Sequence, residues 1–286
     1  MLASAGALGG VSLLRGGDPP VPRVQTTAYA DLAAARPDEL RIHRVAAAPE
    51  ILVFDYPSYL AQAVALNRVA ALVEKRNLPR ERVVTPAELE RYIAARGGRF
   101  VTFYYGHNYD GTELARFFEL AAADANVRLN PGERRLREAL LAAGAIRRDG
   151  EGFAPGTGAA YAISLVSAAA PDVAPEFGAR ARRVAVVHEL GHAWYAVNAD
   201  YQAYARAFWY DVLTPRERDG FRRFLAARSY DVSNEALVID EAQAYLAFTP
   251  DARVVSDAEL GLPDGRLAAL RARFDPPAMP PWHGNE

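Results

Sequence analysis

"RRVAVVHELGHAWYAVN", residues 182–198, places two of the chain's five histidines four positions apart in a stretch that is otherwise mostly apolar. Glu189 directly follows the first of them, His188, and the second is His192. The apolar flanks predict a buried helix, in which a carboxylate and two imidazoles each need a partner. The interpretation of the chain therefore depends on what these three side chains bind.

The spacing of the two histidines indicates a metal site. Residues four apart lie on one face of a helix, so His188 and His192 can both offer a ring nitrogen to one ion. Zinc is the ion that the pattern H-E-x-x-H favours, and Glu189 can then take a proton from an activated water as general base. Gly191 has no side chain, so we expect another segment to approach this helix closely.

A zinc site of this kind needs a third protein ligand. The chain contains no cysteine, and its other histidines are His43, His107 and His283. These three lie in strand, loop and tail contexts, where we expect surface or hydrogen-bonded histidines. The third ligand should therefore be a carboxylate.

The helix predicted over residues 234–248 carries three candidate carboxylates. Glu241 lies in the middle of a mostly apolar stripe, where a carboxylate needs a cation. Glu235 lies in the first turn, where the helix dipole already accounts for it, and it is the rival ligand. Asp240 is a candidate for orienting a ligand histidine, or else a solvated carboxylate. We expect Glu241 to complete the site.

Two motifs together resemble a known family. HELGH at residues 188–192, followed by DEAQAYL at residues 240–246, is similar to the gluzincin branch of the zincin metallopeptidases, over roughly residues 158–248. In that branch the two motif histidines and a glutamate from a later helix bind zinc, and the motif glutamate is the general base. The resemblance implies that the zinc ligands are His188, His192 and Glu241 and that the base is Glu189.

The resemblance also implies a strand before the motif helix that pairs with an extended substrate. The segment AAYAISL, residues 159–165, is expected to be this edge strand. The later motif departs from the usual N-E-x-x-S-D form, because Ile239 stands where the aspartate would be. Glu235 therefore stays open as an alternative ligand.

Peptide hydrolysis also needs a donor for the oxyanion that forms on the attacked carbonyl. Tyr245 lies one turn beyond Glu241 on the same helix, and Tyr230 lies in the loop before that helix. Either tyrosine can supply this donor, or be a packed aromatic residue without a catalytic role.

Composition limits the classes of partner. With 33 basic and 35 acidic residues, the formal net charge is -2, so no overall field favours nucleic acid. No apolar run is long enough for an integral membrane segment. The uncharged stretch over residues 2–14 is typical of the apolar part of a signal peptide and predicts export to the periplasm or beyond, with a disordered tail as the alternative.

The predicted fold class is α+β and mostly helical. Residues 1–37 are expected to be a signal-like segment and linker, with folded structure beginning between residues 27 and 40. A mixed α/β half, the N-terminal subdomain, is expected over residues 38–150. A zincin-like catalytic subdomain with a small sheet and an active-site helix is expected over residues 151–275, followed by a tail at 276–286.

Local patterns predict individual elements. Strands are expected over residues 41–45, 51–56, 99–105 and 160–166. Helices are expected over residues 57–75, 112–125, 131–144, 178–197, 200–212, 215–228 and 234–248, with a further one that begins after Thr85 and ends before Gly97.

The function that these features favour is a zinc-dependent metallopeptidase acting on a peptide or protein substrate. A zinc hydrolase that attacks another kind of bond stays open, because the motif specifies activated water and not the bond. A non-catalytic envelope or binding module that retains a zincin-like fold is the third alternative. Glu189 argues against this last class, because a purely structural zinc site does not need that carboxylate.

Overall fold

The computed structural model of the chain describes residues 22–283 except 76, 105, 173, 174 and 229. It confirms the predicted class, since the fold is α+β, about 51% helical, with a small mixed sheet. The stretch over residues 2–14, from which we expect export, lies outside the described residues. None of the described helices has both the length and the apolar character that crossing a bilayer requires.

The main sheet has five strands in the order β1-β2-β3-β7-β4. Neighbouring pairs alternate in direction: β1 with β2 and β3 with β7 are parallel, whereas β2 with β3 and β7 with β4 are antiparallel. The strands are β1 (Val24–Thr27), β2 (Arg41–Val45), β3 (Ala48–Tyr56), β4 (His107–Asp110) and β7 (Tyr161–Val166).

The expectation that residues 159–165 form an edge strand is wrong. β7 lies inside the sheet, where Tyr161 pairs with Ile51 of β3 on one side and with Asp110 of β4 on the other. The edge strand next to β7 is β4. The boundary expected at residue 150 runs through the sheet, because β7 comes from the later segment and both of its neighbours come from the earlier one.

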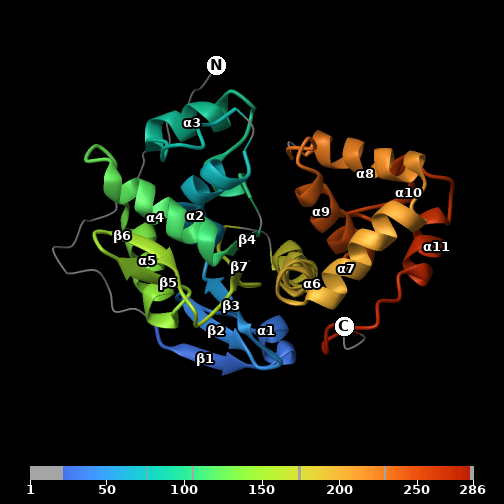
Figure 1. Cartoon of the computed structure of the whole chain (residues 1–286), viewed down its shortest axis with the longest axis horizontal. Helices are drawn as coiled ribbons and strands as arrows, with labels where there is room; N and C mark the ends of the chain where they lie inside the picture. The colour runs from blue at the N-terminus through green and yellow to red at the C-terminus, as the bar shows by residue number, and fades with distance from the viewer. Residues whose placement is uncertain (1–21, 76, 105, 173–174, 229, 284–286) are drawn as a thin grey trace, which may run out of the picture.

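Helices cover both faces of the sheet (Figure 1). Alternate residues of a strand point to opposite faces, so Leu52 and Phe54 of β3 join the apolar cluster formed with α2 (Tyr59–Val73), α4 (Gly111–Ala123) and α5 (Pro131–Ala143). Ile51 and Val53, which alternate with them along the strand, face the opposite way.

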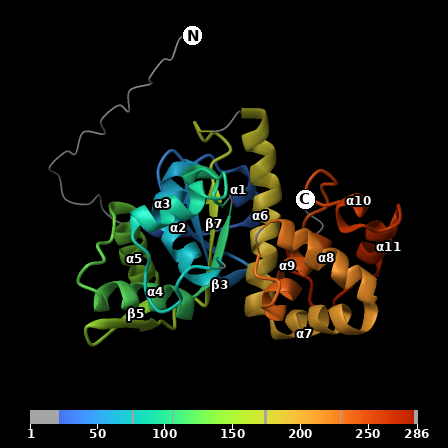
Figure 2. The same ribbon diagram turned by 90° about the horizontal axis from the view of Figure 1, so that it is seen from above.

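On that opposite face lie α1 (Tyr29–Ala34) and α6 (Pro175–Val197), and α6 carries the H-E-x-x-H motif. Its residues Val186 and Leu190 pack against the sheet, whereas Val187 and Tyr195 pack into a second cluster formed by the later helices. Figure 2 shows α6 running between the sheet on one side and these helices on the other. This two-sided burial explains why the motif is apolar on nearly all sides.

The described residues that follow α6 form helices and loops and contain no strand. α7 (Ala199–Ala207) continues as the π-helical turn η2 (Phe208–Val212), so the helix expected to residue 212 changes type at residue 208. The helices that follow are α8 (Pro215–Ala227), α9 (Glu235–Ala247), α10 (Asp257–Leu260) and α11 (Arg266–Arg273).

Two local predictions had different outcomes. Helix α3 (Pro86–Ala94) begins after Thr85 as expected, and Thr85 forms a capping box with Glu88. The strand expected over residues 99–105 is wrong for the described residues 99–104, which contain instead the short 3-10 helix η1 (Phe100–Thr102). The aromatic residues Phe100 and Phe103 pack against the cluster that α3 forms, so they find burial without joining the sheet.

Some elements were not expected from the sequence. β1 and α1 fall within the segment expected to be a linker, and β1, from Val24, is the first element of the described residues. Leu32 of α1 is completely buried beneath α6. A separate hairpin joins β5 (Ile146–Asp149) to β6 (Gly152–Pro155).

A buried ion pair fixes α6 on the sheet. Nη1 and Nη2 of Arg182 each lie 2.8 Å from an oxygen of Asp55 on β3, and the two side chains are 1% and 0% exposed. The guanidinium also donates to the carbonyl oxygens of Val166 at 2.9 Å and Leu32 at 2.5 Å. One side chain of α6 therefore holds β3, the end of β7 and α1 together.

Replacing Asp55 by Asn should lower the free energy of unfolding by about 3–5 kcal/mol, because it leaves the Arg182 charge buried without its counter-ion. Urea denaturation with a chelator present measures this loss without any contribution from bound metal. Asp38→Asn is the control, because Asp38 is 90% exposed and pairs with Arg41 at 3.6 Å, so it should cost less than about 1 kcal/mol. Equal losses in the two variants would contradict the role given to the buried pair.

Candidate metal centre

Helices α6 and α9 bring three predicted ligands together. The ligand atoms of His188, His192 and Glu241 all lie within 4.8 Å of one another. The two Nε2 atoms are 3.2 Å apart, and the oxygens of Glu241 lie 4.0 Å from Nε2 of His188 and 3.8 Å from Nε2 of His192. In a tetrahedral zinc site with bonds of about 2.0–2.1 Å the ligand atoms are about 3.3 Å apart. The observed triangle needs only a small contraction to reach that size.

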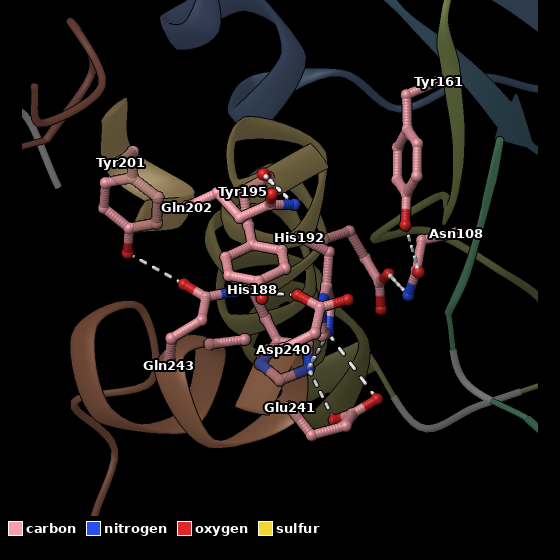
Figure 3. Close-up of polar contacts among 12 residues, drawn as sticks. Asn108, Tyr161, His188, His192, Tyr195, Tyr201, Gln202, Asp240, Glu241 and Gln243 are labelled. Carbon is pink, nitrogen blue, oxygen red and sulfur yellow. Dashed lines mark hydrogen bonds and ion pairs between the residues drawn. The ribbon is translucent and has the colours of Figure 1, made fainter. Parts of the chain in front are cut away.

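The outer nitrogens of both histidines are tied to neighbouring side chains, and Figure 3 shows His192 beside its partner Asp240. Asp240 accepts a hydrogen bond from Nδ1 of His192 at 2.8 Å, and Nδ1 of His188 lies 2.9 Å from the hydroxyl oxygen of Thr249. That hydroxyl donates to the carbonyl oxygen of Ala244 at 3.0 Å, so it is an acceptor for His188. Hydrogens on Nδ1 leave both Nε2 lone pairs facing the common point, which is the arrangement a metal-binding histidine requires.

The electrostatics of the cluster call for a cation. Burial raises the pKa of Glu241 to about 8, and its Oε2 is buried without a hydrogen-bond partner in the described part of the chain. Burial lowers the pKa of His192, but the charges on Asp240 and Glu241 outweigh this effect and raise it to about 10. Burial and the charge on His192 together lower the pKa of His188. A divalent ion would satisfy the buried carboxylate and both imidazoles at once.

Glu189 lies beside this cluster and is 6% exposed. Asn108 on the edge strand β4 donates from Nδ2 to Oε2 of Glu189 at 3.3 Å, and Tyr161 donates its hydroxyl hydrogen to Oδ1 of Asn108 at 2.7 Å. Gly106 packs so tightly on this carboxylate that a Cβ there would lie 1.9 Å from Oε1. Burial raises the pKa of Glu189 to about 7. The edge of the sheet thus sets the position of the candidate base.

Glu235, the rival ligand, lies outside the cluster. Its carboxylate accepts hydrogen bonds from Arg222 at 2.8 Å and from the indole nitrogen of Trp209 at 2.8 Å. It is therefore turned to the other side of α9, as the helical phase of Glu241 predicts.

Both candidate tyrosines line the same cleft as His188 and Glu189. The rings of Tyr245 and His188 have their centroids 4.8 Å apart, and Tyr245 forms a side-chain hydrogen bond with Tyr230. Burial raises the pKa of both hydroxyls, so both remain protonated at neutral pH and able to donate. The geometry keeps both as candidates for the oxyanion donor.

The remaining histidines take no part in the cluster. His43 and His107 are buried, and each has a hydrogen-bonding neighbour: Nδ1 of His43 lies 2.8 Å from the hydroxyl of Thr27, and Nδ1 of His107 lies 3.0 Å from that of Tyr109. The ring of His283 lies against Phe248, with a centroid distance of 6.0 Å.

No family model, curated protein or solved structure matches this chain. The resemblance to the gluzincins therefore rests on the motif residues, and the function must be argued from their geometry. Thr249, Asn108 and Tyr161 belong to that geometry but were not predicted. Each lies 53 or more positions in sequence from the residue that it contacts, so no local pattern connects them.

The expectation for Gly191 is confirmed. A Cβ at this position would lie 2.3 Å from Cδ2 of Phe248, the residue at the end of α9. The glycine therefore allows α6 and α9 to approach closely at the level of the three candidate ligands.

Gly191→Ala should lower the free energy of unfolding by about 1–3 kcal/mol, because the new methyl group overpacks the buried ring of Phe248. It should also weaken zinc binding, because the methyl group pushes α9 away from α6 and α9 carries Glu241. Denaturation and competition against a chelator measure the two effects. Gly152→Ala is the control, with its nearest neighbours at 3.6 Å or more, and should change stability by no more than about 0.5 kcal/mol. A fully tolerated Gly191→Ala would show that this close approach is not required.

Proposed function

We propose that the chain is a zinc-dependent metallopeptidase in which His188, His192 and Glu241 hold the ion and Glu189 is the general base. One observation carries the proposal: three donor side chains converge from two helices, the outer nitrogens of the two histidines are hydrogen-bonded away from the centre, and the carboxylate of Glu189 lies beside them in an open cleft. A purely structural site would close its fourth position with another ligand.

Each residue has a distinct task in this proposal. Zinc, when bound, supplies a Lewis acid that lowers the pKa of water and polarises a carbonyl group. Glu189 accepts the proton of the attacking water on its carboxylate and delivers it to the leaving amine. Asn108 holds that carboxylate through its amide hydrogen. The hydroxyl of Tyr245 or Tyr230 donates to the oxygen of the attacked carbonyl as negative charge develops on it.

The surroundings of the site favour an extended peptide as substrate. The cleft has a volume of about 600 Å³ and includes Gly106, which leads directly into β4. In the described sheet β4 is paired with β7 on one side only, and no strand covers its other edge. The N–H of Asp110, at the end of β4, donates to the carboxylate of Glu113 at 3.0 Å. An extended peptide can add to such an edge through main-chain hydrogen bonds. In this proposal β4 takes the role that the sequence assigned to residues 159–165.

The purified protein should carry about one zinc ion per chain, and three variants should separate ligand from outer partner. Glu241→Gln should abolish tight binding, because the amide is a poor zinc ligand. Asp240→Asn and Thr249→Val should weaken binding by about 10–100-fold, because they disturb the orientation of a ligand histidine. Zinc titration against a competing chelator gives the measurement. Glu235→Gln is the control, and loss of zinc in that variant would overturn the ligand assignment.

Glu189→Gln should keep the zinc content and the fold but lower peptide hydrolysis by about 10²–10⁴-fold, because the amide cannot accept the proton of water. The measurement is the cleavage rate of a mixed peptide library, with zinc content and circular dichroism determined on the same samples. Undiminished cleavage by this variant would place the base elsewhere. A zinc-loaded wild-type protein that cleaves no peptide would favour the hydrolysis of another bond or a non-catalytic module.

A further inference from the structure

Lys75 is the only lysine in the chain, whose other basic residues are all arginine or histidine. It follows the end of α2 and is only 7% exposed. Its side chain lines the same cleft as His188 and Glu189. A buried ammonium group is costly without a counter-charge, so its position beside the candidate catalytic residues calls for an explanation.

The immediate surroundings of Lys75 hold its charge without using its hydrogen-bond donors. Nζ lies 3.8 Å from the centroid of the Tyr104 ring and 5.0 Å from that of Phe103. Aromatic faces attract an ammonium group, yet they leave N–H bonds free to point at an acceptor. Among the residues that the structure describes, Nζ has neither a hydrogen bond nor an ion pair.

Glu74 and Glu241 act on Lys75 through long-range electrostatic attraction and form no direct contact with its ammonium group. Burial lowers the pKa of Lys75, and the charges on Glu74 and Glu241 oppose this effect. The carboxylate of Glu74 accepts a hydrogen bond from the hydroxyl of Tyr109 at 2.7 Å, and that of Glu241 faces the two histidines. Neither is within ion-pair distance of Nζ, so neither of these carboxylates takes up its hydrogen-bond donors.

The three arginines that line the cleft are different. Arg180 and Arg253 both bind the carboxylate of Asp251, at 2.9 Å and 3.1 Å from their Nε atoms, and Arg228 binds Glu259 at 2.8 Å. Within the described lining of the cleft, Glu189 is the only carboxylate. Lys75 is therefore the cleft cation whose charge is not already matched by a paired carboxylate among the described residues.

We propose that Lys75 binds a carboxylate of the substrate, so that the cleft selects peptides with a negative charge close to the cleaved bond. This inference rests on the proposed peptidase function and adds a substrate class to it. The carboxylate is either an acidic side chain or the C-terminal carboxylate of the peptide, and both offer the same acceptor oxygens. A compact ammonium group beside two aromatic rings suits a single oxygen acceptor, whereas a guanidinium would suit a bidentate one.

Binding can be measured without turnover in zinc-loaded Glu189→Gln protein. The probes are short N-acetylated peptides in matched pairs: Glu against Gln at each position of a C-terminally amidated peptide, and free against amidated C-terminus in a neutral peptide. In calorimetry, the affinity of the peptide with one kind of carboxylate should be roughly tenfold or more higher than that of its amide, because only the carboxylate forms a buried ion pair with Lys75. Adding Lys75→Met should remove that difference and leave the affinity of the amide unchanged.

Arg253→Met is the matched control, because it removes a positive charge from the same cleft while Asp251 keeps Arg180 as partner. It should leave the carboxylate preference unchanged. If Lys75→Met does not fold by circular dichroism, labelling of the unaltered protein replaces it. Acetic anhydride can acetylate no other lysine, so peptide mapping follows Lys75 alone, and the carboxylate peptide should slow this reaction while its amide partner does not.

The outcomes separate this inference from the proposed function. A preference for Glu over Gln assigns the site to an acidic side chain, and a preference for the free C-terminus assigns it to the terminal carboxylate. Equal binding of acid and amide, or a preference that survives Lys75→Met, overturns the inference. Cleavage of neutral peptides by the wild-type protein would then still support the peptidase. Lys75-dependent binding without any cleavage would support the carboxylate site and contradict the peptidase.

Discussion

The arrangement of the whole centre depends on the contact between Arg182 and Asp55. An α-helix turns by about 100° per residue, so fixing Arg182 on the sheet fixes the direction of every later side chain of α6. Glu189, about two turns further on, points to nearly the same side and meets the edge of the sheet at Asn108. His188 and His192 point roughly a quarter to a third of a turn away, toward α9.

This buried contact determines the rotation of α6 about its own axis. A buried ion pair contributes little net stability, because desolvation offsets most of the attraction, but its geometry allows few alternatives. The apolar residues of α6 would pack against the sheet in several rotations of the helix. Only one rotation brings the guanidinium to Asp55 and to the carbonyl oxygens of Val166 and Leu32. The ion pair thus selects the rotation that brings His188 and His192 toward Glu241.

Sequence periodicity predicted the parts of the site that lie on a single helix. The four-residue spacing of the histidines and the apolar stripe around Glu241 both show which way a side chain faces on its own element. Neither shows which element lies opposite. Asn108 and Thr249 are ordinary polar residues in sequence, and their roles follow only from the packing of β4 and α9 around α6.

The same limit applies to the fold: elements with a local pattern were predicted from the sequence, and pairings between distant segments were not. Most helices of the second half follow from period and capping, whereas the position of β7 inside the sheet depends on pairing between distant segments. The aromatic run near residue 103 has the composition of a strand, yet it finds its burial against α3. The hairpin of β5 and β6 does carry a local signal, because its two-residue turn begins with Gly150, which adopts a φ of 59°, and is completed by Glu151.

The central position of β7 has a consequence for how the chain reaches its native state. β3 and β7 pair residues that are about 110 positions apart, and closing such a long loop is entropically unfavourable until the contacts are made. α6 can settle on the sheet only after this pairing, because its partners come from both strands. The cluster of His188, His192 and Glu241 therefore forms late in folding, and a nascent chain cannot assemble it until the sheet has closed across both halves of the sequence.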